Sequence, residues 1–222
     1  MLLIHLIFHL KIINMKVSHK YGFFILLMII LTACASHKKI MYNILNDLKQ
    51  NKIMENKKFD IDLFKKNNEQ GSYRLTLDDG SEVLQMEWPP TGYVERINFP
   101  DKFYNIYKEY YPDGKIKLLE YRLYNIKFGS SEHYDKQGNK TLTNEDEKFG
   151  KFDYNQLILF LDKKGYVDIQ KGNWKNVVDI EFDNDNDKKL WKVDINDEIL
   201  RELVIDGNSG KIIRTNRIYV YE

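Results

Sequence analysis

The stretch "YKEYYPDGKIKLLEYRLY", residues 107–124, contains the pattern that decides the fold. Pro112-Asp113-Gly114 is a turn sequence, because proline presets φ, aspartate bonds to nearby backbone and glycine accepts left-handed geometry. The runs on either side mix aromatic, aliphatic and charged residues in the manner of half-buried strands. This stretch therefore predicts an antiparallel β-hairpin.

Two neighbouring stretches repeat the same design. In "YRLTLDDGSEVLQMEW", residues 73–88, Asp79-Gly80 separates two alternating segments. In "EHYDKQGNKTLT", residues 132–143, the turn is Gln137-Gly138-Asn139. Aromatic residues make up 14% of the chain, which favours strands over a helical bundle. We therefore expect a β-hairpin region over residues 57–148.

The second and third hairpins share an order of aromatic residue, turn, glycine and lysine, carried by Gly114-Lys115 and by Gly138 with Lys140. This order resembles the MORN-like repeats of bacterial proteins that include the group labelled YwqK-family antitoxins. The resemblance covers only these two hairpins, and it implies a toxin-neutralising role. Any meandering antiparallel sheet could produce the same order, so ordinary hairpin packing is the alternative.

Two segments beside the hairpins interrupt the pattern. In "EWPPTGYVERINFP", residues 87–100, the pair Pro89-Pro90 argues against a central strand, because proline cannot donate a ladder hydrogen bond. We expect a surface loop there, with Trp88 and Tyr93 at its ends, either contacting a partner or covering the edge of the core. In "ENKKFDIDLFKKNNEQG", residues 55–71, apolar side chains at alternate positions indicate a short strand or a loop.

The clearest helix of the chain lies in "FDYNQLILFLDKKGY", residues 152–166. Asp153 is a suitable N-cap and Gly165 a suitable stop. Four apolar side chains fall on one face: Tyr154, Leu157, Ile158 and Leu161. Four strands are expected after it, at residues 177–182, 190–195, 198–206 and 211–221.

This helix and meander, with Trp191 near the start of one strand and "IDGNSGKII" at residues 205–213, resemble the PepSY-type domain. The resemblance covers residues 153–215 and implies a small inhibitory or binding module without catalytic residues. The extra residues Asn208-Ser209 and the long tail depart from the family's compact pattern. The fold class expected for the chain is α+β: an antiparallel β-hairpin meander packed with one or two short helices, then a C-terminal α-β-β-β-β module over residues 149–222.

The start of the chain has the layout of an export signal. In "MKVSHKYGFFILLMIILTAC", residues 15–34, two lysines precede an apolar run that ends in small residues. The run is shorter than the ~20 residues of a membrane-spanning helix. Residues 1–14 are interpreted as lying upstream of the true start at Met15; the alternative is a genuine extension. Residues 34–56 are expected to form a tether and a short amphipathic helix.

Leu31-Thr32-Ala33-Cys34 resembles the lipobox of bacterial lipoproteins. The resemblance implies cleavage between Ala33 and Cys34 and covalent lipid on the Cys34 thiol, with no other cofactor. A single cysteine cannot form an internal disulfide, and the alternative is a buried free thiol at the end of a core helix. Ala35, rather than aspartate, follows the cysteine, which in that family implies the outer membrane, facing the periplasm.

Charge and residue content narrow the classes of function. Three lysines in residues 1–33 leave 31 basic against 33 acidic residues in the remainder, so no basic footprint for nucleic acid is present. Asp183, Asp185 and Asp187 have the opening spacing of a calcium loop, but Lys188 stands at the glycine position and Asp194 at the glutamate position. A solvated hairpin tip is the simpler interpretation, and weak calcium binding is the alternative.

We expect a non-enzymatic, lipid-anchored periplasmic binding protein, in particular an immunity protein that neutralises a toxin delivered into the periplasm. Contacts through a sheet face or edge, with aromatic anchors and acidic rim residues, would suit such a role. The candidate contact residues are Trp88, Tyr93 and Trp174. The alternatives are an envelope structural or assembly lipoprotein, a PepSY-like modulator of a periplasmic peptidase, and an enzyme with a carboxylate pair.

Overall fold

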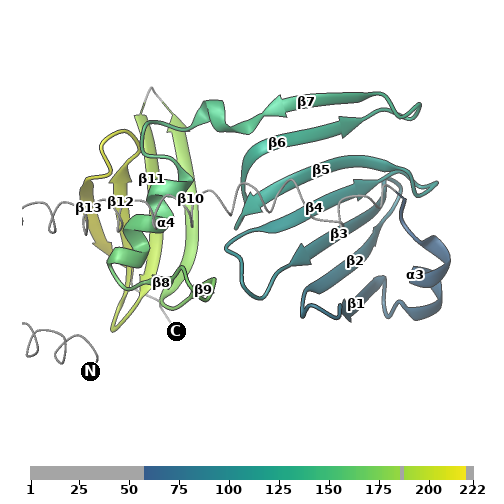
Figure 1. Ribbon diagram of the computed structural model, residues 1–222, viewed down its shortest axis with the longest axis horizontal. Coiled ribbons are helices and arrows are strands. Elements are labelled where there is room, and N and C mark those ends of the chain that lie inside the picture. Colours follow the sequence, from purple (N-terminus) through teal and green to yellow (C-terminus); the bar gives the residue numbers. More distant parts are fainter. Residues whose placement is uncertain (1–57, 186–187, 219–222) are drawn as a thin grey trace, which may run out of the picture. The chain divides into compact units, whose positions relative to one another are not determined.

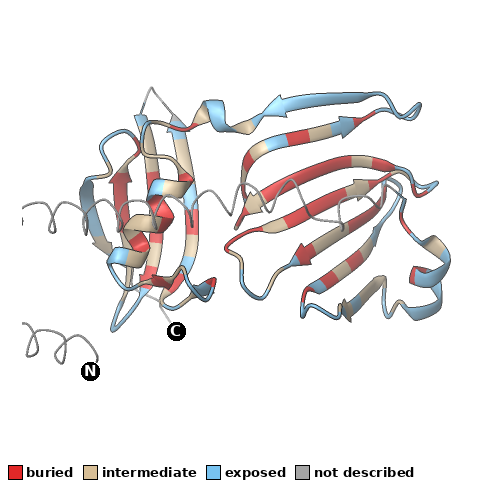
Figure 2. Ribbon diagram, in the orientation of Figure 1, coloured by how far each residue is buried: buried red, intermediate tan, exposed pale blue. Residues whose placement is uncertain are grey.

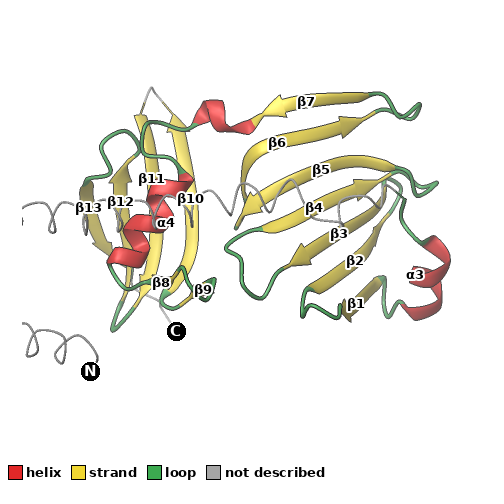
Figure 3. Cartoon of the chain, viewed as in Figure 1, coloured by secondary structure: helices red, strands yellow, loops and turns green. Residues whose placement is uncertain are grey.

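The computed structural model describes residues 58–185 and 188–218, all within one compact unit that spans Met54–Glu222 (Figure 1). The predicted signal sequence, Cys34 and the predicted tether and helix lie outside the described residues. The described part consists of antiparallel sheets and short helices (Figure 3). The predicted α+β class is therefore confirmed.

The first described helix, α3 (Ile61–Asn67), corrects the prediction of a short strand or loop in this segment. The Asp60 carboxylate accepts a hydrogen bond from the Leu63 backbone N–H at 2.9 Å and caps the helix. Phe64 is the buried side chain of α3. The alternating apolar residues Phe59, Ile61 and Leu63 form too short a strand pattern to outweigh a good helix N-cap. Of these three, Phe59 makes a strand-like backbone hydrogen bond, in which its N–H donates to the Gly114 oxygen at 2.8 Å.

The hairpin region forms one seven-stranded antiparallel sheet in which every strand pairs with its neighbours in sequence. The three predicted hairpins are confirmed as β1–β2, β4–β5 and β6–β7. The strands are β1 (Ser72–Thr76), β2 (Glu82–Trp88), β3 (Gly92–Asn98), β4 (Asn105–Tyr110), β5 (Ile116–Leu123), β6 (Ile126–Tyr134) and β7 (Lys140–Asn144). A short 3₁₀ helix, η2 (Glu145–Lys148), follows β7.

The predicted surface loop over residues 87–100 is wrong for most of its length. β2 continues to Trp88 and β3 begins at Gly92, so Pro89-Pro90, joined by a cis peptide bond, occupies only the turn between them. The prolines lie outside the ladder, so their missing N–H groups interrupt no strand pairing. Tyr93 consequently lies inside a strand and is buried.

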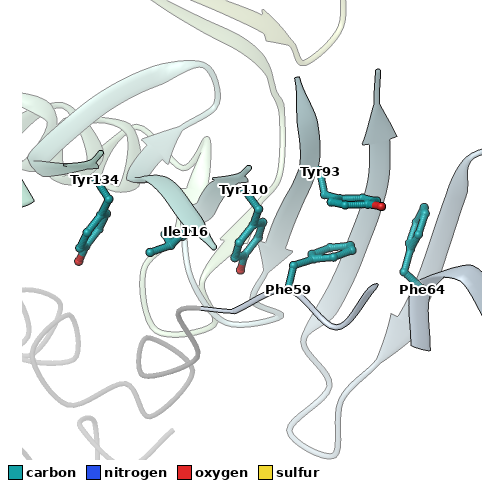
Figure 4. Packing of buried hydrophobic residues seen from close by; sticks show 6 residues of the cluster. All are labelled: Phe59, Phe64, Tyr93, Tyr110, Ile116 and Tyr134. Atoms are coloured by element: carbon teal, nitrogen blue, oxygen red, sulfur yellow. The ribbon is translucent and has the colours of Figure 1, made fainter. Parts of the chain in front are cut away.

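One end of the sheet carries an aromatic cluster of Phe59, Phe64, Tyr93, Tyr110, Ile116 and Tyr134 (Figure 4). The ring of Phe59 stacks on that of Tyr93 with centroids 4.5 Å apart, and Phe64 of α3 meets Tyr93 edge-on at 5.6 Å. Aromatic pairs in these geometries add to the free energy of burial. The cluster therefore attaches α3 and the residues before it to the sheet.

The C-terminal module begins with α4 (Tyr154–Lys163), which confirms the predicted helix. Asp153 and Gln156 form a capping box at its start, and the predicted apolar stripe is buried. A four-stranded antiparallel sheet follows a two-stranded one. The strands are β8 (Val167–Asp168), β9 (Asn173–Trp174), β10 (Val177–Asp185), β11 (Lys188–Asn196), β12 (Leu200–Asp206) and β13 (Ile212–Arg217).

Trp191 is at the centre of this module and is fully buried. Its indole Nε1 donates to the backbone oxygen of Phe152 at 2.9 Å, and its ring stacks on Phe149 at 5.3 Å. Figure 1 shows α4 lying across the four-stranded sheet. The buried side chains of that sheet include Ile180, Trp191, Val193, Ile195, Leu203 and Ile205 (Figure 2). One face of the sheet is therefore the core of the module.

Candidate functional site

The opposite face of the four-stranded sheet carries a row of carboxylates. Side chains alternate between the two faces of a strand, so the residues between the buried ones point to the other face. The strand register places Asp179 opposite Asp194 and Asp194 opposite Glu202. Three neighbouring strands, β10, β11 and β12, thus each contribute one acid to the same rung.

Two further acids of β10 extend the row along the strand. Lys192 of β11 has its Nζ 3.4 Å from Asp183 and 3.9 Å from Glu181. Lys192 lies directly opposite Glu181 in the register and partly compensates these two acids. Among the described residues, no lysine or arginine forms a salt bridge with Asp179, Asp194 or Glu202, and the Asn216 amide donates a hydrogen bond to Glu202 at 2.7 Å. We define the acidic face as Asp179, Glu181, Asp183, Asp194 and Glu202.

The electrostatics of the acidic face are unfavourable for the isolated fold. Burial raises the pKa of Asp194, and the neighbouring charges of Glu202, Asp179 and Glu181 raise it further. Like charges directly opposite each other on a sheet are destabilising. The row therefore lowers the stability of the isolated chain, whereas a cationic surface placed against it would remove the repulsion.

The surroundings of the acidic face give it shape and some apolar surface. A shallow hollow beside β10 is lined by Asp179, Glu181 and Asp183, with Asn125 and Ile126 among its other residues. Val178, which occupies the β-bulge next to Asp179, is 52% exposed. Carboxylates around an exposed aliphatic side chain are the components expected of a surface that binds a basic protein segment.

The aspartates with the predicted calcium-loop spacing do not surround a common position in the structure. Asp183 lies opposite Leu190, whereas Asp194 lies several rungs away, opposite Asp179. The β10–β11 hairpin pairs Asp185 with Lys188, and Asp187 lies outside the described residues. Among residues 58–185 and 188–218 no group of three or more His, Cys, Asp or Glu side chains is arranged to hold a metal ion.

The three predicted aromatic contact residues have different environments. Trp88, at the end of β2, is 59% exposed. Tyr93 is stacked in the aromatic cluster and only 6% exposed, which contradicts its predicted role as a surface contact. Trp174 is partly buried, and its ring packs edge-on against Phe103 at 4.8 Å and Tyr124 at 5.1 Å. Packing accounts for Tyr93 and Trp174, so Trp88 alone stays a surface candidate.

The seven-stranded sheet also contains buried charges, and each is paired. Glu120 is fully buried between Arg122 and Lys127, and the Arg122 guanidinium lies 3.5 Å from the ring centroid of Tyr107. Lys108 is 3.2 Å from Glu95. Paired, hydrogen-bonded buried charges are the arrangement that a stable interior requires. These groups are therefore part of the framework of the sheet.

The enzyme hypothesis requires a cleft with two carboxyl groups, one of raised pKa. Asp194 and Glu202 are neighbouring acids, and the pKa of Asp194 is raised. They lie on an open sheet face, and neither lines the hollow beside β10. This pair therefore lacks the cleft that the enzyme hypothesis requires.

Sequence reasoning missed the acidic face, although a trace of it is visible. Asp179 and Glu181 lie two residues apart in the strand predicted at 177–182, and Asp183 continues this spacing directly after it, which places all three on one face if the strand extends that far. Their alignment with Asp194 and Glu202 depends on the register between strands, which a single sequence does not specify.

In the part of the chain that the structure describes, no helix combines the length and apolarity needed to cross a bilayer. Searches with family models, among curated proteins and among solved structures find no match to this chain.

Proposed function

We propose that this chain is a lipid-anchored binding protein of the periplasmic side of the outer membrane, where it acts as an immunity protein against a toxin delivered into the periplasm. The acidic face is the observation that carries the proposal. Mutual repulsion among Asp179, Asp194 and Glu202, which form no salt bridge within the described residues, weakens the fold, and such a feature is typical of a surface kept for binding.

The mechanism follows from charge and exposure. Surface carboxylates attract a basic partner over about a Debye length, ~8–10 Å at physiological salt, and speed its encounter. Docking of lysine or arginine side chains between Asp179, Asp194 and Glu202 then removes the mutual repulsion of the three acids. Val178 adds apolar contact beside them. Occlusion of the toxin's basic active surface would block its activity without any catalysis by this chain.

Lipid on Cys34 would confine the protein to the compartment in which the toxin arrives. One acyl chain binds a membrane only marginally, whereas two or more give stable anchoring. The lipobox resemblance at Leu31–Cys34 supports this part of the proposal.

The test uses the product of the neighbouring open reading frame, exported to the periplasm of a sensitive host. Co-expression of the full chain is expected to restore growth. The double charge reversal Asp194→Lys/Glu202→Lys is expected to abolish protection. The matched control Asp78→Lys/Glu82→Lys changes net charge equally on exposed acids of the other sheet and is expected to protect fully.

Equal protection by both double variants would rule out the acidic face as the contact surface. A neighbouring product that is neither toxic nor bound would rule out the immunity role itself. The helix α4 is followed, after the short β8–β9 pair, by the four-stranded sheet β10–β13. This order supports modulation of a periplasmic peptidase, which the PepSY resemblance implies, as the second candidate. Binding of a peptidase through the acidic face would favour that candidate.

A further inference from the structure

The two larger sheets have four edge strands, and three of them carry devices that discourage pairing with another chain. β1 has Arg74 at its centre. β10 has a bulge and four acids, and β13 has a bulge and two arginines, Arg214 and Arg217. β7 has the sequence Lys140-Thr-Leu-Thr-Asn144, with a single charge at one end. All five of its residues are exposed (Figure 2).

Within residues 58–185 and 188–218, no strand pairs with the outer edge of β7, and this edge presents backbone groups in a defined order. Asp135 N–H donates to the Asn139 oxygen at 3.1 Å, which makes these two residues a hydrogen-bonded pair. Hydrogen-bonded pairs recur at every second rung of an antiparallel ladder, so Thr141 and Thr143 bond to β6. The N–H and C=O groups of Lys140, Leu142 and Asn144 consequently point away from β6.

We propose that two copies of this chain join edge to edge through β7, in an antiparallel pairing centred on Leu142. In this register Leu142 lies opposite Leu142 of the second copy, Thr141 opposite Thr143, and Lys140 opposite Asn144. No like charges face each other, and Thr–Thr pairs are favourable cross-strand neighbours. A two-fold axis through Leu142 makes the same patch serve both copies. This inference is independent of the proposed function.

Charge around β7 selects the antiparallel direction. Lys136 and Lys140 lie at the start of the strand, and three acids follow its end in η2, namely Glu145, Asp146 and Glu147. Antiparallel pairing brings the basic start of each strand toward the acidic end of the other. Parallel pairing would place like charges together.

The interface is small. Standard stable interfaces bury about 1,600 Å² in total, far more than two five-residue strands can supply. The pairing is therefore weak and concentration-dependent, and trapping by a covalent bond is the appropriate measurement.

The test introduces single cysteines into the full chain, followed by mild oxidation and non-reducing electrophoresis of the cell fraction that contains the protein. In Leu142→Cys the two Cα atoms would be about 5.5 Å apart, within disulfide range. In Lys140→Cys, on the same free edge, the two copies' residues would be four strand positions apart, about 13 Å, which is out of range. The unaltered chain, with Cys34 alone, measures the background.

We expect Leu142→Cys to give a product of twice the mass of the monomer band and Lys140→Cys to give only background. Equal yields from both variants would indicate random collision and overturn the proposal, as would background yields from both.

A second experiment measures the oligomeric state of Leu142→Lys by sedimentation. This variant places two like charges opposite each other, so it is expected to remain monomeric at concentrations where the unaltered chain dimerises. Leu63→Lys, on exposed α3 surface, is the matched control and is expected to dimerise; dimerisation of Leu142→Lys would contradict the proposal.

Discussion

At the residue scale, four aspartates hold four of the turns. Each carboxylate accepts hydrogen bonds from backbone N–H groups two to four residues further along, at 2.9 Å for Asp79, 3.1 Å for Asp113, 2.8 Å for Asp135 and 2.7 Å for the Ser209 N–H at Asp206. Side-chain hydrogen bonds from Asn139 and Ser209 lower the pKa of Asp135 and Asp206 most, and the backbone bonds lower it further. For Asp79 and Asp113 the backbone bonds are the main cause of the lowered pKa. The aspartates that predict these turns from the sequence therefore also stabilise them through hydrogen bonds.

Asp79→Ala is expected to lower the free energy of unfolding, because the Ser81 N–H loses its acceptor. The adjacent exposed Asp78→Ala is the control and is expected to have little effect. A lowered pKa makes the stabilisation present above pH 3.8 and lost as pH falls through the folded-state value. Urea unfolding at pH 7 and pH 3 should therefore show a difference between the two variants that shrinks at the lower pH. A difference independent of pH would contradict this account.

Gly92 is required by its surroundings as well as by its backbone angle. Its φ is +126°, and a Cβ there would lie 2.0 Å from the Tyr110 carbonyl oxygen. Gly71 also has positive φ, at +82°, but nothing lies within 4 Å of its Cβ position.

Gly71→Ala is expected to lose only about 1–2 kcal/mol of stability, from left-handed strain. Gly92→Ala is expected to lose clearly more, because β3 and β4 must separate to accommodate the methyl group. Thermal unfolding of the two variants side by side checks this order, and equal losses would show that the close approach to Tyr110 has no energetic weight.

At the element scale, the acidic face predicts a variant that stabilises the fold and weakens binding. Asp194→Asn removes the central charge of the row and is expected to raise the free energy of unfolding by roughly 0.2–1 kcal/mol at low salt, less at high salt. Asp183→Asn, which removes a carboxylate 3.4 Å from Lys192, is the matched control and is expected to give no gain.

The pH dependence of this effect runs opposite to that of the turn aspartates. The pKa of Asp194 is raised above 3.8, so protonation of this group favours the folded state. That contribution is fully present below pH 3.8 and is lost as pH rises through the raised folded-state value. The advantage of Asp194→Asn over the unaltered chain should therefore be largest at neutral pH and disappear in acid. An advantage that persists at pH 3 would contradict the proposed repulsion.

Elements whose own residues strongly favour one conformation were predictable from the sequence. Segments in which two local signals favour different conformations were not. The hairpins at Asp79-Gly80 and Pro112-Asp113-Gly114 have turn residues that suit few other conformations. α4 combines an N-cap, an apolar stripe and a glycine stop. The prediction for the α3 segment was wrong because a weak strand pattern overlapped a helix N-cap. The prediction of a surface loop over residues 92–98 was wrong because the pair Pro89-Pro90 forms a tight turn rather than part of a long loop.

At the scale of the whole molecule, the proposed membrane anchor depends on a single residue, Cys34. Cys34→Ser is expected to move the protein from the membrane fraction to an unprocessed or soluble form, because the acyl chains have no other attachment. Mass spectrometry of the unaltered protein should find the mature chain beginning at a lipidated Cys34. A bare thiol with the preceding residues still attached would remove the anchor from the proposed function.

The amino-acid sequence by itself determined the local elements: the hairpins, the capped helix α4 and the α+β class. These follow from turn chemistry and from the periods of apolar side chains, which act over a few residues. Only the tertiary structure decided that the strands form separate seven- and four-stranded sheets, and that Tyr93 is buried. It also decided that acids distant in sequence share one rung and that β7 has a strand partner on one side only among the strands that the structure describes. Strand register and the choice of neighbour depend on contacts between distant residues, and no local pattern specifies them.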